Sequence, residues 1–223
     1  VSVPTTTPGL FLVPSLDTTA TGQVLRVRAL APVVATWNGG AGSYLDPTAW
    51  SFDMPPLPGA SGIPSRDDGS LYHVRIDGDP SVDSLVDLGG SVRIESLLLG
   101  AGDALQIGAG TATPAALAIG GAANRPGSRR IDNDGSVLVG QMGSLLAESR
   151  LDLAGTGELR INSNGVLGSE SGGALAVTNG VGHTLRAGGH IDLGTGTTFT
   201  SRLTNDGLLL VDRVGAPLQL DGS

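Results

Sequence analysis

The sequence predicts an all-β chain folded as a parallel β-solenoid, or β-helix, and two observations carry this prediction. Short segments of the form apolar, any residue, apolar recur from residue 74 to the last residues, with glycine turns between them. Three consecutive segments start at residues 159, 175 and 191, spaced 16 apart, and the next starts at 209. A reused strand-and-turn unit buries its apolar face only by stacking on its neighbours. The segments are Val74–Ile76, Val92–Ile94, Leu105–Ile107, Leu117–Ile119, Leu151–Leu153, Leu159–Ile161, Leu175–Val177, Ile191–Leu193, Leu209–Val211 and Leu218–Leu220.

The turns between the segments also repeat. Residues 131–139 and 203–211 share an apolar-x-Asn-Asp-Gly-x-apolar-x-Val frame, and shorter Asn-Gly versions occur at 164–165 and 179–180. Asn-Gly and Asp-Gly accept the positive φ that tight turns demand, so these dipeptides predict corners.

The same dipeptides suit hairpins, which leaves an antiparallel β-sandwich as the alternative fold. A sandwich core of this size would contain more aromatic residues, whereas only Phe199 is aromatic after Tyr72. Ladders of Leu, Ile and Val stack repetitively without aromatic rings, and this favours the solenoid.

Composition and charge exclude several classes of protein. Of 223 residues, 39% are apolar, enough to bury a core, and the 36 glycines show no collagen period. A net charge of −8 argues against nucleic acid as a partner, because binding it needs a positively charged surface. Cysteine is absent, so neither disulfides nor thiolate metal sites are expected. No apolar run is long enough to span a membrane, and without a signal-like start the chain reads as a mature or trimmed product.

Residues 1–30 form the first of three regions, an N-terminal extension. An apolar run ends at Pro14, and a second strand is predicted over residues 24–30. The alternation places Leu25 and Val27 on one face and Arg26 and Arg28 on the other. Neither strand has an evident hairpin partner, so both are candidate donor strands for another molecule. The apolar run consists of Leu10, Phe11, Leu12 and Val13.

The second region, residues 31–70, holds four of the seven aromatic residues within sixteen positions: Trp37, Tyr44, Trp50 and Phe52. Two indoles and a phenol supply enough apolar area to cover the open first rung of a stack, so the predicted role is a cap. The functional alternative is an exposed platform on which sugar rings stack.

The stretch from Trp37 to Trp50, WNGGAGSYLDPTAW, is followed by a proline-rich segment at 54–58. It resembles the opening segment of bacterial secreted β-helical proteins, although Tyr44 and Ala49 stand where tryptophan and asparagine are commoner. The third region, residues 71–223, holds the rungs, which resemble autotransporter-associated and haemagglutinin-like passenger repeats. The resemblance implies an exported bacterial protein of the cell surface or extracellular matrix, with a parallel β-helix. It implies no catalytic residue.

No pattern in the sequence points to catalysis or to a defined metal site. Asp132, Asp134 and Gly135 resemble the start of a calcium loop, but Gly143 stands where its bidentate glutamate is required. Structural calcium remains open, without a ligand set. The three histidines show no His-x-x-x-His or Glu-x-x-His spacing, so a zinc site is unsupported. They are expected to lie in surface turns. The chain is therefore predicted to be no enzyme, with a polysaccharide-acting β-helix enzyme as a minor alternative. The histidines are His73, His183 and His190.

The ends of the predicted stack direct attention to self-assembly. Leu218 and Leu220 still read as a rung, and no lid follows them. Either the chain continues or another molecule completes the stack. The leading hypothesis is an extracellular structural subunit that polymerises head-to-tail, with residues 10–13, Leu25 and Val27 contacting Leu218 and Leu220 of a neighbour. The alternatives are a monomeric surface adhesin or passenger stalk that binds glycans, and a terminal run folded onto its own chain.

Overall fold

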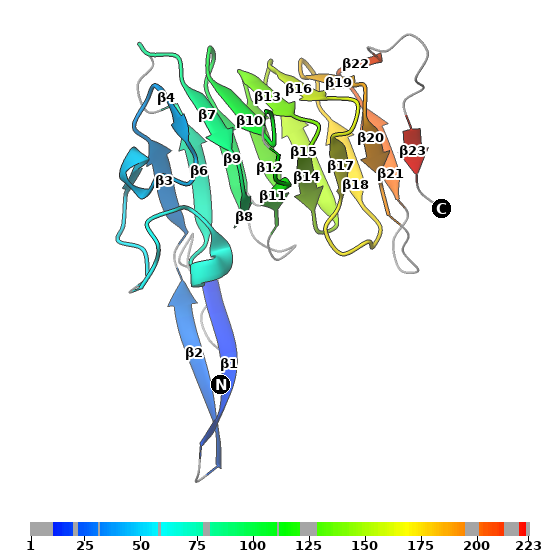
Figure 1. Cartoon of the computed structure of the whole chain (residues 1–223). Coiled ribbons are helices and arrows are strands. Elements are labelled where there is room, and N and C mark those ends of the chain that lie inside the picture. The colour runs from blue at the N-terminus through cyan, green and yellow to red at the C-terminus, as the bar shows by residue number, and fades with distance from the viewer. Residues whose placement is uncertain are drawn as a thin grey trace.

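The computed structural model describes residues 11–19, 22–30, 32–57, 59–77, 81–110, 112–120, 129–194, 201–211 and 219–221. This part of the chain is all-β, with three large sheets and a separate two-stranded hairpin (Figure 1). Its helices are two single 3₁₀ turns, η1 (Pro47–Ala49) and η2 (Arg66–Asp68). No helix in the described residues is both long and apolar enough to cross a membrane.

Each large sheet is a row of short strands. The first sheet has the order β5 (Trp50–Phe52), β3 (Val33–Trp37), β6 (Tyr72–Ile76), β9 (Ser96–Leu99), β12 (Arg130–Asn133), β15 (Arg150–Ala154), β18 (Ala176–Asn179) and β21 (Arg202–Asn205). The second has β4 (Ala41–Ser43), β7 (Leu85–Leu88), β10 (Ala104–Ile107), β13 (Ser136–Val139), β16 (Glu158–Ile161), β19 (Thr184–Ala187) and β22 (Leu208–Val211). The third has β8 (Ser91–Ile94), β11 (Ala115–Ile119), β14 (Gly143–Ala147), β17 (Val166–Ser169), β20 (His190–Asp192) and β23 (Gln219–Asp221).

From β6 onward, consecutive strands step through the first, second and third sheets, and each strand pairs in parallel with the strand three places later. We call three such strands a circuit. His73 pairs with Ser96, and Arg150 with Ala176, so equivalent positions in successive circuits lie 23 and 26 residues apart. Among the described strands of the three sheets, only β5 pairs antiparallel, against β3. The mostly parallel pairing is compatible with a β-helix or another solenoid-like fold and rules out the antiparallel sandwich.

The core lies between the three sheets. From Val74 to Leu193, both apolar ends of every predicted segment are buried, and the middle residue is more exposed in each except Leu117–Ile119, where Ala118 is also buried. These segments are confirmed. The last circuit differs, because Val211 is 54% exposed and Leu209 is only partly buried. Leu218 lies outside the described residues.

The Asn-Gly corners are confirmed in place, although the reason for the glycine differs from the prediction. Asn133-Asp134-Gly135 joins β12 to β13, and the corresponding turn at 205–207 joins β21 to β22. Neither Gly135 nor Gly207 has a positive φ. A Cβ on Gly135 would lie 2.2 Å from the Asp103 carbonyl oxygen of the preceding circuit. Close stacking of one turn on another therefore requires glycine at these corners.

The N-terminal extension contains a hairpin. Strand β1 (Phe11–Thr19) pairs antiparallel with β2 (Gly22–Leu30) over nine register pairs. The expectation that the two strands lack a hairpin partner is therefore wrong. Ala20 and Thr21 between them are not a typical turn dipeptide, and this hid the hairpin in the sequence. The hairpin extends away from the three sheets (Figure 1).

Candidate self-assembly surfaces

The aromatic residues of the second region lie at the N-terminal end of the core. Trp37, Tyr44 and Trp50 are all buried, and the Trp50 ring packs edge-on at 5.1 Å from Trp37 and 4.8 Å from Tyr44, between ring centres. Trp50 Nε1 donates to the Tyr44 carbonyl oxygen at 2.8 Å, and the Tyr44 hydroxyl donates to Pro64 O at 3.0 Å. Partly buried Phe52 packs against Tyr72. Rings buried in this way are part of the hydrophobic core and offer no exposed platform for sugars.

Burial also governs the chemistry of the phenol. It raises the pKa of the Tyr44 hydroxyl well above its ordinary value, with a smaller contribution from Tyr72. Tyr44 is therefore a neutral hydrogen-bond donor that fixes the segment around Pro64 to the core.

The first sheet ends at its N-terminal side in the short strand β5, which closes the outer side of β3. β5 pairs with β3 from Ala35 to Trp37, so the outer side of β3 is occupied. Beyond β5, Asp53 continues the closure: its Oδ1 accepts from Val34 N at 2.7 Å, and its backbone N–H donates to Val34 O at 3.1 Å. No strand of a neighbour could pair with β3 without displacing these contacts.

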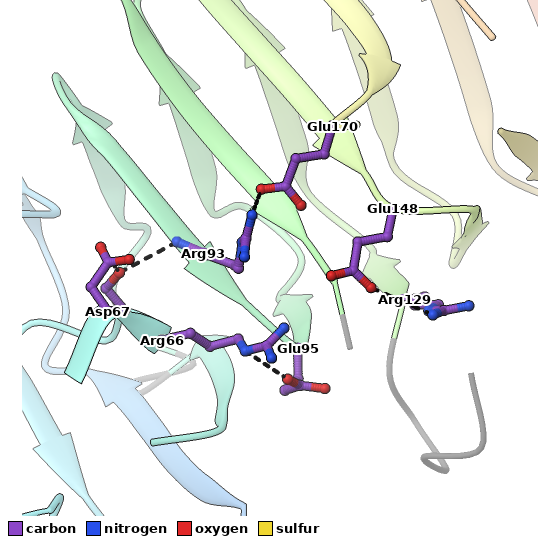
Figure 2. A network of polar contacts seen from close by, with 8 residues as sticks. Arg66, Asp67, Arg93, Glu95, Arg129, Glu148 and Glu170 are labelled. Carbon is purple, nitrogen blue, oxygen red and sulfur yellow. Dashed lines mark hydrogen bonds and ion pairs between the residues drawn. The ribbon is translucent and has the colours of Figure 1, made fainter. Parts of the chain in front are cut away.

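The N-terminal edge of the third sheet is closed by the η2 segment. Ser65 Oγ accepts from the backbone N–H of Arg93 in β8, at 3.4 Å, and donates to Asp67 Oδ2 at 2.8 Å. The Arg66 guanidinium lies 3.2 Å from the carboxylate of Glu95, which is 1% exposed (Figure 2). A buried ion pair and a hydroxyl thus hold this segment against the outer edge of β8.

Further ion pairs continue this network along the outer surface of the third sheet (Figure 2). Arg93 in β8 pairs with Glu170, which follows β17, so one contact spans several strands. Arg129 lies 3.5 Å from Glu148 and donates to Ser149 Oγ at 2.8 Å. These guanidinium groups are matched by carboxylates of the same chain, which gives the network a structural role.

The C-terminal edge contrasts with the other end. Strands β21, β22 and β23 are the last of their sheets among the described residues. Leu208 N donates inward to the His183 carbonyl oxygen at 3.0 Å, and because alternate residues of a parallel strand face opposite neighbours, the N–H and C=O groups of Leu209 and Val211 point outward. Leu208, Val211 and Leu220 are each more than half exposed, at 52%, 54% and 52%. The sequence predicts Leu220 at this edge, and the structure adds Leu208 and Val211.

A ladder of buried polar side chains runs along the corner between the first and second sheets. His183 Nδ1 lies 2.6 Å from Asn179 Oδ1, and Nε2 lies 3.3 Å from Asn133 Nδ2. Asn179 Nδ2 donates to Asn205 Oδ1 at 2.7 Å and to Leu208 O at 3.2 Å. The ladder thus anchors the last circuit to the body of the stack. Burial lowers the pKa of His183 to about 4.

The expectation that the histidines lie in surface turns is wrong. His183 is fully buried, His73 lies within β6 with Nδ1 2.6 Å from Ser96 Oγ, and His190 begins β20. The turn at 179–183 has the glycine pattern of an exposed loop, so no feature of the sequence marked the buried ring.

The acidic residues considered as calcium ligands make contacts within the protein. Asp134 Oδ1 accepts from Thr156 N at 2.8 Å, and Asp132 is paired with Arg130, its Oδ2 lying 2.7 Å from Nε. Within the described ranges, no group of three or more His, Cys, Asp or Glu residues is placed to hold a metal ion.

The predicted donor residues lie on both strands of the hairpin, except Leu10, which lies outside the described residues. Phe11, Leu12 and Val13 are in β1, and Leu25 and Val27 are in β2. The structure does not bring them near Leu220, since the hairpin and β23 lie at opposite ends of the stack (Figure 1). Contact between the two sets would require a second molecule.

Comparison of the chain with protein-family models, curated proteins and solved structures gives no match.

Proposed function

We propose that this chain is a parallel β-helix that serves as a structural, non-catalytic subunit and assembles head-to-tail into a filament or matrix by strand addition. The observation that carries the proposal is the difference between the two ends of the stack. At the N-terminal end, the three-residue strand β5 covers the outer side of β3, and the η2 segment covers that of β8. At the C-terminal end, β22 presents outward backbone groups beside exposed Leu208 and Val211.

The hairpin supplies the complementary surface. A two-stranded hairpin alone in water is marginally stable, and a third strand or a packed face normally supports it. Within the described residues, β1 and β2 pack extensively only against each other. Adding the hairpin to the open edge of a neighbour would give it that third strand, and it would give the last circuit a cover.

The energetics and the symmetry of such a contact favour a polymer. Each Leu or Val side chain buried at the junction contributes roughly 1.5–3 kcal/mol, and exposed Leu208 and Val211 are available for burial. The donor and the acceptor are different surfaces of one chain, so the contact is heterologous. It builds a filament unless the rotation between subunits closes a ring.

The proposed location is the bacterial cell surface or the extracellular matrix, on the strength of the resemblance of the segment from Trp37 to Trp50 to bacterial secreted β-helical proteins. Surface glycans are a partner only in the alternative, a monomeric adhesin stalk. The buried aromatic rings lend that alternative no binding platform.

Sedimentation velocity and negative-stain imaging of the purified chain at two concentrations, about 1 μM and 100 μM, test the proposal. We expect fibres or a rising sedimentation coefficient for the full chain and for a deletion of residues 1–10, which keeps both hairpin strands. Deletion of residues 1–30 should leave a monomer. A full chain that stays monomeric at both concentrations refutes the polymer, and fibres that persist without residues 1–30 refute hairpin donation.

A further inference from the structure

We infer that the outer edge of β2, and not that of β1, is the edge that adds to β22 of a second copy of this chain. The inference rests on the proposed function and specifies its contact. It follows from the antiparallel register of the hairpin and from the position of one proline.

In an antiparallel pair, facing residues alternate between those that exchange two hydrogen bonds and those whose N–H and C=O groups point away from the partner strand. Pro14 faces Val27 in the register. Proline has no N–H, and within sheets it is placed with its nitrogen directed to the outside of an edge strand. Pro14 and Val27 therefore form a pair that exchanges no hydrogen bonds, and the N–H and C=O groups of Val27 point away from β1.

The alternation then assigns every outward group of the hairpin. The outward positions of β2 are Gln23, Leu25, Val27 and Ala29, and those of β1 are Leu12, Pro14, Leu16 and Thr18. The β2 edge carries an N–H at all four of its positions, whereas the β1 edge lacks the one at Pro14.

Strand addition takes its affinity from main-chain hydrogen bonds, so a missing donor in the middle of an edge weakens it. Proline on an edge is one of the devices by which native sheets avoid pairing with other chains. The β1 edge is blunted in this way and the β2 edge is not.

The acceptor is a second copy because that copy carries the complementary edge. In β22, Leu209 and Val211 direct their N–H and C=O groups outward, two residues apart, which matches the spacing of the outward groups of β2. The apolar side chains of Leu208 and Val211 stand exposed beside them, whereas the exposed positions of β21 are the polar residues Arg202 and Asn205. An apolar strand such as β2, with Leu25 and Val27, fits β22 better than β21.

Two proline substitutions at facing positions of the hairpin distinguish donation by the β2 edge from donation by the β1 edge. Leu16 and Leu25 are register partners and both are outward positions, so Leu16→Pro and Leu25→Pro each remove one outward N–H and leave the ladder within the hairpin intact. We expect Leu25→Pro to weaken self-association about 10-fold or more, because it also leaves an acceptor carbonyl unpaired, and Leu16→Pro to associate like the unmodified chain. Amide-exchange protection at inward-facing Arg26 and Arg28 verifies that the hairpin still forms.

Complementation by mixing identifies the acceptor. Val211→Pro removes an outward donor of β22 and leaves the hairpin unchanged. Each of Leu25→Pro and Val211→Pro should be monomeric where the unmodified chain associates, and their mixture should give a one-to-one dimer that grows no further. The dimer forms because Val211→Pro keeps the donor edge of β2, whereas Leu25→Pro keeps the acceptor edge of β22.

The outcomes are distinguishable. Loss of association in Leu16→Pro, or retention in Leu25→Pro, overturns the assignment to β2 while the polymer stands. A mixture that stays monomeric overturns the assignment to β22. An unmodified chain that never associates refutes the proposed function, and this inference with it.

Discussion

Asn133 Nδ2 lies 3.3 Å from His183 Nε2, although two circuits separate these residues along the stack. The contact fixes the protonation of the ring. Asn133 Oδ1 accepts from Gly135 N at 3.1 Å, so its amide nitrogen is the atom that donates to His183. Asn179 Oδ1 accepts from His183 Nδ1 at 2.6 Å. The hydrogen-bond network therefore assigns a neutral imidazole with its proton on Nδ1.

The unfolding free energy should depend on pH through His183. Burial lowers the pKa of the folded-state ring to about 4, from 6.5, so the unfolded chain binds more protons between these values. The contribution of His183 to stability is complete above pH 6.5 and declines as the pH falls towards 4, by up to about 3 kcal/mol. Urea unfolding at pH 7.5, 5.5 and 4.5 measures the slope of the unfolding free energy against pH. In His183→Asn the slope should flatten, and an unchanged slope would mean that another group causes it.

The cluster of Trp37, Tyr44 and Trp50 should contribute a large share of the unfolding free energy. Replacing Trp50 by alanine removes its packing against Trp37 and Tyr44, and we expect a loss of about 3–5 kcal/mol of unfolding free energy. Trp50→Phe keeps a ring but loses the hydrogen bond to Tyr44 O, so it should cost less. Denaturant unfolding of the two variants measures the loss of unfolding free energy in each. Equal costs would show that the ring contacts do not stabilise the first circuit.

A glycine at a corner should be required for packing. A Cβ at Gly157 would lie 2.2 Å from the Gly135 carbonyl oxygen, a distance that forces the turns apart. We expect Gly157→Ala to lower the unfolding temperature by several degrees, corresponding to about 1–3 kcal/mol. Gly188 is the matched control, because its Cβ would meet Ile161 O at an ordinary 3.5 Å. If both alanine variants melt alike, close stacking is not the reason for the glycine.

The buried ion pair of the η2 segment should matter more than an exposed one. Glu95→Gln leaves the Arg66 guanidinium beside a neutral amide, and removing one partner of a buried pair costs about 3 kcal/mol. The exposed pair of Arg150 and Asp152 is the control, since Arg150→Gln should cost less than about 1 kcal/mol. Amide exchange at Arg93 reports whether the segment has left β8. If the Arg93 amide of Glu95→Gln stays protected from exchange, Ser65 alone holds the η2 segment against β8.

The rungs could be predicted from the sequence because two apolar residues per strand mark the buried face. The 16-residue spacing was misleading, since it joins β16 to β18 and β20 and passes over the strands between them. In β17 and β19 the second inward position is Ser169 or Ala187, so the apolar pattern is weak there. A full circuit therefore takes three strands, and periodicity alone did not reveal this.

The surfaces were less predictable than the core. Alternation predicts Leu25 and Val27 as donor candidates, but the sequence at Ala20 and Thr21 carries no turn signal that would predict the pairing of β1 with β2. The burial of His183 depends on residues 50 positions away, which local patterns do not report. Val211 pairs with the fully buried Ala187, so its exposure comes from the place of β22 at the end of the second sheet. Leu208 pairs with the partly exposed Thr184, so it lies at a position that faces away from the core.

Backbone amide exchange at Leu209 and Val211, followed as the concentration of the full chain is raised, tests most directly whether the last circuit receives a strand. We expect the protection of these two N–H groups to rise with concentration, together with that of Leu25 and Val27, as assemblies form. Assemblies that grow while the four groups continue to exchange rapidly would contradict strand addition at this edge and place the contact on another surface.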